Sequence, residues 1–405
     1  MDLEAVYRCP GEAYDISRSV HLGRLASFYP ACGDCPHRGD TATFSARRIR
    51  QLTVVQRQAG RANPLFHGEG ISGTYLNEIG PELALRVGQA MGTYLAQNVV
   101  DTAPRVVLAN DGRLSTAELA AAAADGLRWT GCSVADLGAA TAPCIALAAE
   151  QQRADGALLI GNPGGKSQEV GLTLWGRGGE PLSAPGELDS VRRLFDSPAP
   201  QPRSAFGGIK RLAAGADYLA QLEPQFHALR PLRFLVDTTS LALIEYIRRL
   251  TNKVALDIHF GQKIVDRVRG ARVHFGIWID GDGESCRIVD ERGEPVPVER
   301  MVVLVAREFL TEQAVVKVAL SGPMARLAPK LKTLGVETFA AESGRQAIHK
   351  AVCCHRPDLA ADEHGRIWFA GQPTCADALK ALTMLLTLLS RSDRPLSERI
   401  ASEIL

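Results

Sequence analysis

The stretch RVVLANDGRLSTAELAAAAADGLRWTGCSVADLG, residues 105–138, decides the fold class of this chain. It opens with the apolar, β-branched run Arg105–Ala109, which predicts a buried strand. The alanine-rich segment Ser115–Gly131 then predicts a helix, with Ser115 as its N-cap. A second strand is expected at Ser133–Leu137. A strand, a helix and a strand in this order are typical of an α/β domain with a largely parallel sheet.

The same alternation continues on both sides of this stretch. A proline-rich segment, DSPAPQPR at 196–203, predicts a linker after the first domain. The sequence therefore predicts an N-terminal extension at 1–62 and three α/β domains at 63–203, 204–297 and 298–405. Further helices are expected at 81–94, 241–251, 299–310, 324–334 and 376–389, and further strands at 157–160, 233–237, 275–279, 314–320 and 336–339.

Composition excludes several classes of protein. The 405 residues carry a formal net charge of +1 without a long basic or acidic block, so binding to nucleic acid or to a membrane through bulk charge is not indicated. No apolar run reaches the roughly 18 residues of a membrane span, and the N-terminus lacks the apolar core of a signal peptide. Nine cysteines are an odd number and unevenly spaced, which favours a cytoplasmic protein with reduced thiols.

The N-terminal extension contains a candidate metal site. Cys32, Cys35 and His37 form a C-x2-C-x-H pattern, and Cys9 supplies a further thiol. Three thiolates and one imidazole suit a tetrahedral zinc ion, which would contribute folding energy to a short segment with little apolar content. The pattern is also compatible with a redox-active pair of thiols or with cysteines that bind nothing.

Several stretches in a fixed order carry a family resemblance. They are FHGEGISG at 66–73, NDGRLSTAELAAAAADGL at 110–127, ADGALLIGNP at 154–163, GLTLWG at 171–176, GIWIDGDGESCRIVDERG at 276–293 and TCADALKALTMLL at 374–386. Together they resemble the α-D-phosphohexomutase family of phosphomannomutases and phosphoglucomutases, from about Pro64 to the C-terminus. The resemblance implies consecutive phosphohexomutase-like α/β domains, with the N-terminal Cys/His extension outside them.

The resemblance also implies a magnesium site. Family members hold Mg²⁺ with three aspartates on a loop, and the matching residues here are Asp280, Asp282 and Glu284. Alternating carboxylates on a short glycine-containing loop suit the oxygen ligands that Mg²⁺ prefers. This chain departs from the family by having Glu284 in place of the third aspartate and Ser285 in place of the arginine that follows it. The alternative interpretation of the loop is a solvated turn.

The catalytic serine of the family has no counterpart here. The matching segment places Pro163 at the nucleophile position or deletes the position altogether, and proline has no hydroxyl. Ser167 is the remaining candidate nucleophile, with Lys166 beside it to neutralise a phosphate. The alternative is an ordinary polar loop. An arginine that faces phosphate in the family is replaced by Ser72.

Three further residues are predicted to bind substrate. Glu363 and His364 lie in a segment similar to the family's sugar-binding loop, which the sequence Glu342–Arg345 also resembles. Arg113 matches a family arginine that is often structural, so it is expected either to bind substrate or to form an ion pair at a helix N-terminus. The alternative interpretation of the segment 363–366 is a solvated β-turn.

The resemblance implies a phosphohexomutase-like protein that is catalytically degenerate and retains hexose-phosphate binding or a protein partner. Its fourth domain, which grips a substrate phosphate in the family, is expected to be absent. Two alternatives stay open: an active Mg²⁺-dependent mutase with a displaced nucleophile, and a purely structural subunit.

Overall fold

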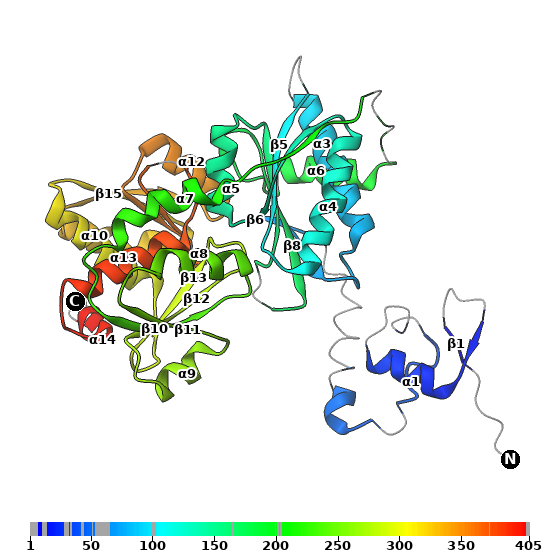
Figure 1. Ribbon diagram of the computed structural model, residues 1–405, viewed down its shortest axis with the longest axis horizontal. Coiled ribbons are helices and arrows are strands. Elements are labelled where there is room, and N and C mark those ends of the chain that lie inside the picture. The colour runs from blue at the N-terminus through cyan, green and yellow to red at the C-terminus, as the bar shows by residue number, and fades with distance from the viewer. Residues whose placement is uncertain are drawn as a thin grey trace. The chain divides into compact units, whose positions relative to one another are not determined.

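The computed structural model describes residues 7–9, 14–27, 32, 35–41, 44–50, 52, 65–98, 103–163, 166–198, 200, 202, 205–371 and 373–401. The chain forms two compact units, Met1–Leu65 and Phe66–Leu405. The larger unit contains three β-sheets (Figure 1).

The small unit is built from short elements. Strands β1 (Tyr7–Arg8) and β2 (Asp15–Ile16) pair in antiparallel fashion. Helix α1 (Arg18–Ala26) follows, and the Ser17 side chain caps it by accepting a hydrogen bond from the Val20 N–H. Serine is favoured at this position because it satisfies a backbone donor that the first helical turn leaves unpaired.

The first sheet of the large unit has seven strands in the order β3-β4-β8-β7-β5-β6-β9. Strands β7, β5, β6 and β9 are parallel, whereas β3, β4 and β8 join them by antiparallel pairs. The sheet is therefore mixed, and the prediction of a largely parallel sheet holds for one half. The strands are β3 (Phe66–His67), β4 (Gly70–Thr74), β5 (Arg105–Asn110), β6 (Ser133–Ala139), β7 (Gly156–Gly161), β8 (Glu169–Trp175) and β9 (Ile209–Arg211).

Helices cover both faces of this sheet. Helices α3 (Pro81–Asn98), α4 (Leu114–Trp129) and α6 (Glu187–Asp196) lie on one side and α5 (Ala142–Gln151) on the other (Figure 1). The predicted N-cap of α4 is wrong, because the extended residue before the helix is Arg113 and Ser115 lies inside the first turn. The side chain of Asp111 shapes this turn by accepting hydrogen bonds from the Arg113 N–H and the Thr116 hydroxyl.

The second sheet has the order β11-β10-β12-β13-β14, with the first three strands parallel. The strands are β10 (Leu232–Asp237), β11 (Leu256–Phe260), β12 (Phe275–Ile279), β13 (Cys286–Asp290) and β14 (Pro295–Val296). The helices of this region are α7 (Gly215–Leu222), α8 (Leu241–Thr251) and α9 (Ile264–Gly270).

The third sheet has the order β16-β15-β17-β18. Its strands are β15 (Val316–Ser321), β16 (Val336–Ala341), β17 (Leu359–Ala361) and β18 (Ile367–Phe369). Its helices are α10 (Val298–Glu312), α11 (Ala328–Thr333), α12 (Arg345–His355), α13 (Ala378–Ser390) and α14 (Leu396–Ala401), and short 3-10 turns occur at 177–179, 223–226 and 322–327. The predicted domain boundaries stay predictions; strand β9, after residue 203, pairs with the first sheet.

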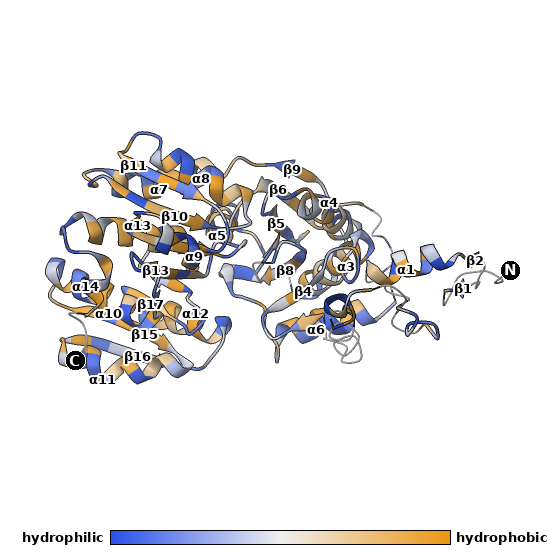
Figure 2. Cartoon of the chain, turned by 90° about the horizontal axis from the view of Figure 1, so that it is seen from below, coloured by the Kyte–Doolittle hydropathy of each residue, from blue (hydrophilic) through white to orange (hydrophobic). Residues whose placement is uncertain are grey.

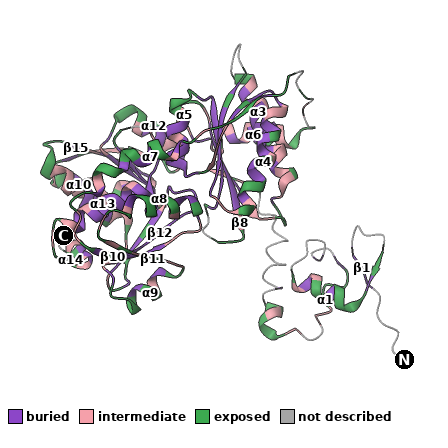
Figure 3. Cartoon of the chain, viewed as in Figure 1, coloured by how far each residue is buried: buried purple, intermediate pink, exposed green. Residues whose placement is uncertain are grey.

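Many buried side chains of the large unit lie on its strands. Every residue of β7 is buried, and the central strands of the first sheet are coloured as buried in Figure 3. Apolar residues gather on the sheets and on the helix faces that pack against them, as Figure 2 shows. No helix formed by the described residues is long and apolar enough to cross a bilayer.

Candidate functional site

The loop Asp280–Ser285 forms the centre of the candidate site. It joins the antiparallel strands β12 and β13, and the Asp280 carboxylate holds it in shape by accepting the N–H groups of Gly283 and Glu284 at 2.7 and 2.9 Å. The backbone carbonyls of Asp282 and Gly283 accept N–H groups from the first residues of α5 and α13. Helices α5 and α13, which belong to the regions of the first and third sheets, thus hold a loop of the second sheet in place.

The chain after β7 approaches this loop closely. The Gly281 N–H donates to the carbonyl of Asn162 at 3.0 Å, and the Thr173 hydroxyl donates to Asp282 Oδ2 at 3.0 Å. A Cβ atom added to Gly161 would lie 2.0 Å from Asp282 Oδ1. Glycine is therefore required at position 161, because a side chain would displace the carboxylate.

The three carboxylates of the loop are buried. Burial raises the pKa of Asp280 to about 7, and burial with the charges of Asp280 and Glu284 raises the pKa of Asp282 well above its usual value. Glu284 forms a buried ion pair with Arg345, whereas Asp282 Oδ1 has no hydrogen-bond partner. Burying charge is costly unless it is compensated, so without a further cation the loop disfavours the ionised forms of Asp280 and Asp282.

The donor set of this loop fits magnesium in part. The unpartnered Asp282 oxygen and the cost of ionising the buried carboxyls without a counter-charge suit a hard cation. Glu284 fits less well, because Arg345 already engages it. No three His, Cys, Asp or Glu side chains of the described residues form a group that could hold a metal ion as they stand. The magnesium and zinc sites therefore stay predictions.

Glu69 links the two segments that resemble the family's sugar loop. Its Oε1 accepts the Arg345 N–H at 2.9 Å, and its Oε2 pairs with Arg366 Nη1 at 2.7 Å. Arg366 also pairs with Asp362 at 2.6 Å. Burial alone would raise the pKa of Glu69, but the two arginines outweigh it and lower that pKa below its usual value. The segments 342–345 and 363–366 thus meet at one carboxylate.

A cavity of about 380 Å³ opens beside these groups. Its lining includes the loop carboxylates, Glu69, Arg345 and Arg366. Pro163 also lines it and lies against strand β8, since a Cβ on Gly171 would be 2.7 Å from Pro163 Cδ. The chain after β7 therefore presents a proline ring to the cavity.

The predicted nucleophile lies elsewhere. Ser167 is exposed, and its carbonyl accepts a hydrogen bond from Arg113. Lys166 is exposed and pairs with Glu169 at 2.7 Å. Arg113 pairs with Asp111 at 2.7 Å and donates to backbone carbonyls, including that of Gly161 at 3.1 Å. None of Ser167, Lys166 and Arg113 is among the described residues that line the cavity, and their predicted roles stay predictions.

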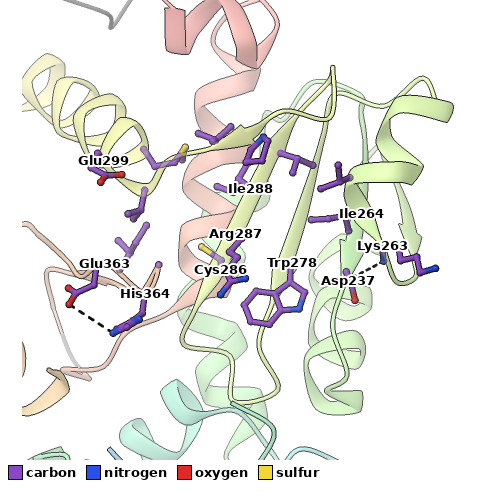
Figure 4. A pocket seen from close by; sticks show the side chains of 18 of the residues that line it. Asp237, Lys263, Ile264, Trp278, Cys286, Arg287, Ile288, Glu299, Glu363 and His364 are labelled. Carbon is purple, nitrogen blue, oxygen red and sulfur yellow. Dashed lines mark hydrogen bonds and ion pairs between the residues drawn. The ribbon is translucent and has the colours of Figure 1, made fainter. Parts of the chain in front are cut away.

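A larger cavity of about 780 Å³ shares part of the same lining (Figure 4). Trp278, Arg287 and His364 line both cavities. The Arg287 guanidinium lies 5.0 Å from the Trp278 ring centroid and pairs with no acidic side chain of the described residues. Figure 4 shows His364 close to Glu363, at a separation of 4.0 Å, and Glu363 Oε2 lacks a hydrogen-bond partner. Of the predicted substrate residues, Glu363 and His364 therefore lie at a cavity.

The predicted zinc ligands differ in burial. Cys9, Cys32 and Cys35 are buried, whereas His37 is exposed and packs edge-on against Tyr7 at 5.2 Å. The cysteines described in both units are free thiols.

Sequence reasoning missed the residues that organise the site: Glu69, Arg287, Arg345, Arg366 and Trp278. A signal existed for Arg345 and Arg366, because each follows a glycine in one of the two segments compared with the sugar loop. For Glu69 no local signal pointed to its partners, since they lie 276 and 297 residues away along the chain.

The known proteins to which this chain is similar are hexose-phosphate mutases. Residues 63–196 match the family model described as "Phosphoglucomutase/phosphomannomutase, alpha/beta/alpha domain I". The chain is 28% identical over 367 residues to a phosphoglucosamine mutase of Methylobacterium sp. (strain 4-46), covering 82% of this chain and 80% of that protein. A phosphoglucosamine mutase of Methylobacterium nodulans is 29% identical over 363 residues, with the same coverage.

Solved structures share the fold. A phosphoglucomutase/phosphomannomutase family protein from Burkholderia thailandensis has a TM-score of 0.71 at 20% identity and covers 83% of this chain and 78% of that one. A putative phosphomannomutase from Thermus thermophilus has a TM-score of 0.70 at 16% identity, with 84% and 82% covered. These likenesses show that the consecutive α/β arrangement is common to all three chains.

Proposed function

This chain belongs to the α-D-phosphohexomutase superfamily, and on that premise we propose that it binds a hexose phosphate without catalysing the mutase reaction. The ligand would occupy the cleft beside the loop Asp280–Ser285. Family members act on hexose phosphates, whereas this chain departs from them at the catalytic residues.

The position of Pro163 carries the proposal. A mutase needs a nucleophile that holds the phosphoryl group between its two transfers. In the family this is a serine after the strand that corresponds to β7, whereas here Pro163 lines the cavity and Ser167 is exposed outside its lining. Proline has neither a hydroxyl nor an N–H donor, so the transfer lacks its acceptor at the usual place.

Arg287 and His364 support retention of phosphate binding. Both line the two adjoining cavities, and Arg287 has no ion pair with the described residues. An unpaired guanidinium suits a phosphate because it offers a planar set of donors. The indole of Trp278 adds apolar surface to the lining of both cavities. Glu363, which lines the larger cavity, could accept a hydrogen bond from a sugar hydroxyl.

Magnesium would contribute charge to this cleft. Asp280 and Asp282 would hold it, with Glu284 as a third ligand in competition with Arg345. A bound Mg²⁺ would neutralise part of the negative charge that a phosphate brings. Arg345 and Arg366 would keep the surrounding loops in place through Glu69.

Measuring the intact mass of the protein tests whether it accepts a phosphoryl group. We expect the intact mass to stay unchanged after incubation with glucose 1,6-bisphosphate and Mg²⁺, and we expect no turnover of glucose, mannose or glucosamine phosphates. A phosphopeptide containing Ser72, Ser167 or Ser285, together with turnover that the matching Ser→Ala change abolishes, would overturn the proposal and identify a displaced nucleophile.

Binding is tested by calorimetry with glucosamine 6-phosphate and with glucosamine alone. We expect the phosphorylated sugar to bind and Arg287→Gln to weaken it about tenfold, the effect of losing one charged hydrogen bond. Lys166→Gln is the matched control, because Lys166 lies outside the cavity lining. If Lys166→Gln weakens the binding of glucosamine 6-phosphate and Arg287→Gln does not, the phosphate binds at the loop after Pro163 and the proposed site is wrong. If the protein binds no sugar phosphate at all, it is a structural subunit.

A further inference from the structure

Three buried thiols gather in the small unit. Cys9, Cys32 and Cys35 are 3%, 5% and 3% exposed. Cys9 packs in one cluster with Tyr7, on which the His21 ring stacks. The C-x2-C spacing keeps Cys32 and Cys35 close together. None of them forms a disulfide.

The fourth group is a buried histidine that the C-x2-C-x-H pattern does not include. His21 is 1% exposed, and its Nε2 atom has no hydrogen-bond partner. The imidazole ring stacks on Tyr7 with centroids 4.4 Å apart. A buried polar atom without a partner costs free energy unless something binds it.

Helix geometry places His21 on the side of α1 that faces the thiols. Residues three and four positions apart share one face of a helix, so His21 shares its face with Arg24 and Leu25. Arg24 Nη1 donates to Cys9 Sγ at 3.0 Å, and Leu25 packs in one cluster with Cys32. His21 is thus next to the residues that contact two of the three cysteines.

His37 does not share these properties. It is exposed on a turn, and only the edge of its ring contacts Tyr7. A structural zinc site has four protein ligands and no open coordination position. An exposed imidazole finds hydrogen-bond partners in water, whereas the buried Nε2 of His21 has none. Burial therefore favours His21 over His37 as the imidazole ligand.

We propose that Cys9, His21, Cys32 and Cys35 bind one zinc ion that stabilises the small unit. The chemistry matches the three-thiolate, one-imidazole set of structural zinc sites. The four side chains do not stand at binding distance in the described structure, so the ion draws them together by side-chain rotation.

The size of the unit explains why a metal is useful. Its described apolar clusters are small: Tyr7, Cys9 and Ile16 form one, and Leu25, Cys32 and Leu52, with Phe44, form another. A chain of this length buries a smaller share of its surface than a larger domain does, and small domains commonly use a metal as a further link. A zinc ion contributes its binding free energy to folding.

The test measures zinc in the full-length protein. We expect about one equivalent by elemental analysis, with a marked loss in Cys32→Ser and His21→Ala. His37→Ala is the matched control and should keep its zinc. Loss of zinc in His37→Ala with retention in His21→Ala would overturn the assignment, and a wild-type protein without zinc would overturn the site.

A second variant separates ligand loss from misfolding. His21→Cys should retain the metal, and in the Co²⁺-substituted protein it should strengthen the thiolate-to-cobalt charge-transfer absorption by about one third, as a fourth sulfur replaces nitrogen. An unchanged spectrum would show that His21 is not a ligand. Hexose-phosphate binding is measured on the same samples, so a failure of this proposal is distinct from a failure of the proposed function.

Discussion

Glu69 is the residue on which two loops of the site depend. Its carboxylate receives Arg366 and the backbone of Arg345, and these contacts hold its pKa below the usual value against the opposing effect of burial. A glutamate with a lowered pKa in the folded state contributes stability above its ordinary pKa. That contribution is lost as the pH falls through the lowered value.

Glu69→Gln should therefore destabilise the protein at neutral pH. The side chain is 35% exposed, so solvent screening limits the cost to about 1–2 kcal/mol. Denaturant unfolding should show the difference from wild type shrinking as the pH drops below 4.5, the ordinary glutamate pKa. Glu169→Gln, in an exposed pair with Lys166, is the control. A difference that does not depend on pH would argue against an ionised Glu69.

Arg345 supplies the cation that pairs with the buried Glu284 carboxylate. Arg345→Gln removes the cation beside Glu284 and leaves three buried carboxylates, which should cost about 3–5 kcal/mol. Millimolar Mg²⁺ should then raise the Tm more than in wild type, because Glu284 becomes available and a ligand of the native state stabilises it. Arg287→Gln, which breaks no ion pair, is the control. Equal Mg²⁺ responses in wild type and Arg345→Gln would contradict the magnesium site.

At the scale of elements, the site exists because the β12–β13 loop and the chain after β7 touch. The N-termini of α5 and α13 donate backbone N–H groups to the same loop. Helix N-termini carry partial positive charge, and they partly offset the negative charge of the loop. The close approach depends on glycine at 161 and 281, where a Cβ would lie 2.0 and 2.8 Å from neighbouring atoms.

Gly161→Ala should disturb this contact. The new methyl group would displace Asp282, at a cost of about 1–3 kcal/mol typical of overpacking. We expect a lower Tm and weaker binding of glucosamine 6-phosphate. Gly270→Ala is the matched control, since nothing lies within 4 Å of its added Cβ. Equal behaviour of the two variants would show that the loops separate without cost.

At the scale of the whole molecule, the division into Met1–Leu65 and Phe66–Leu405 predicts two unfolding events. If zinc stabilises the small unit, a strong chelator added in Mg²⁺-free buffer should lower its transition and leave that of the large unit unchanged. Differential scanning calorimetry checks this, with Cys32→Ser expected to reproduce the chelator's effect without chelator. A chelator that shifts the main transition instead would place the metal in the large unit.

The sequence by itself determined several central strands and long helices of the large unit, because their apolar periods are local properties. Helix α8 (Leu241–Thr251) and strand β12 (Phe275–Ile279) begin and end where their patterns predict. The resemblance to the family could be recognised from the sequence because the motifs that carry it are also local: each is short, and they occur in a fixed order. The sequence analysis did not predict α5, α6, α7, α9, α12 and α14. Helix α14, for example, covers six residues, too few for a reliable period.

Only the tertiary structure decided which polar groups meet. Glu69 lies 276 residues from Arg345 and 297 from Arg366, and no local pattern encodes such a contact. The choice between His21 and His37 has the same origin: spacing in the sequence points to His37, whereas burial leaves His21 with an unpartnered nitrogen. Burial and partner choice depend on the packing of distant segments, which sets the cost of leaving a polar atom unpaired.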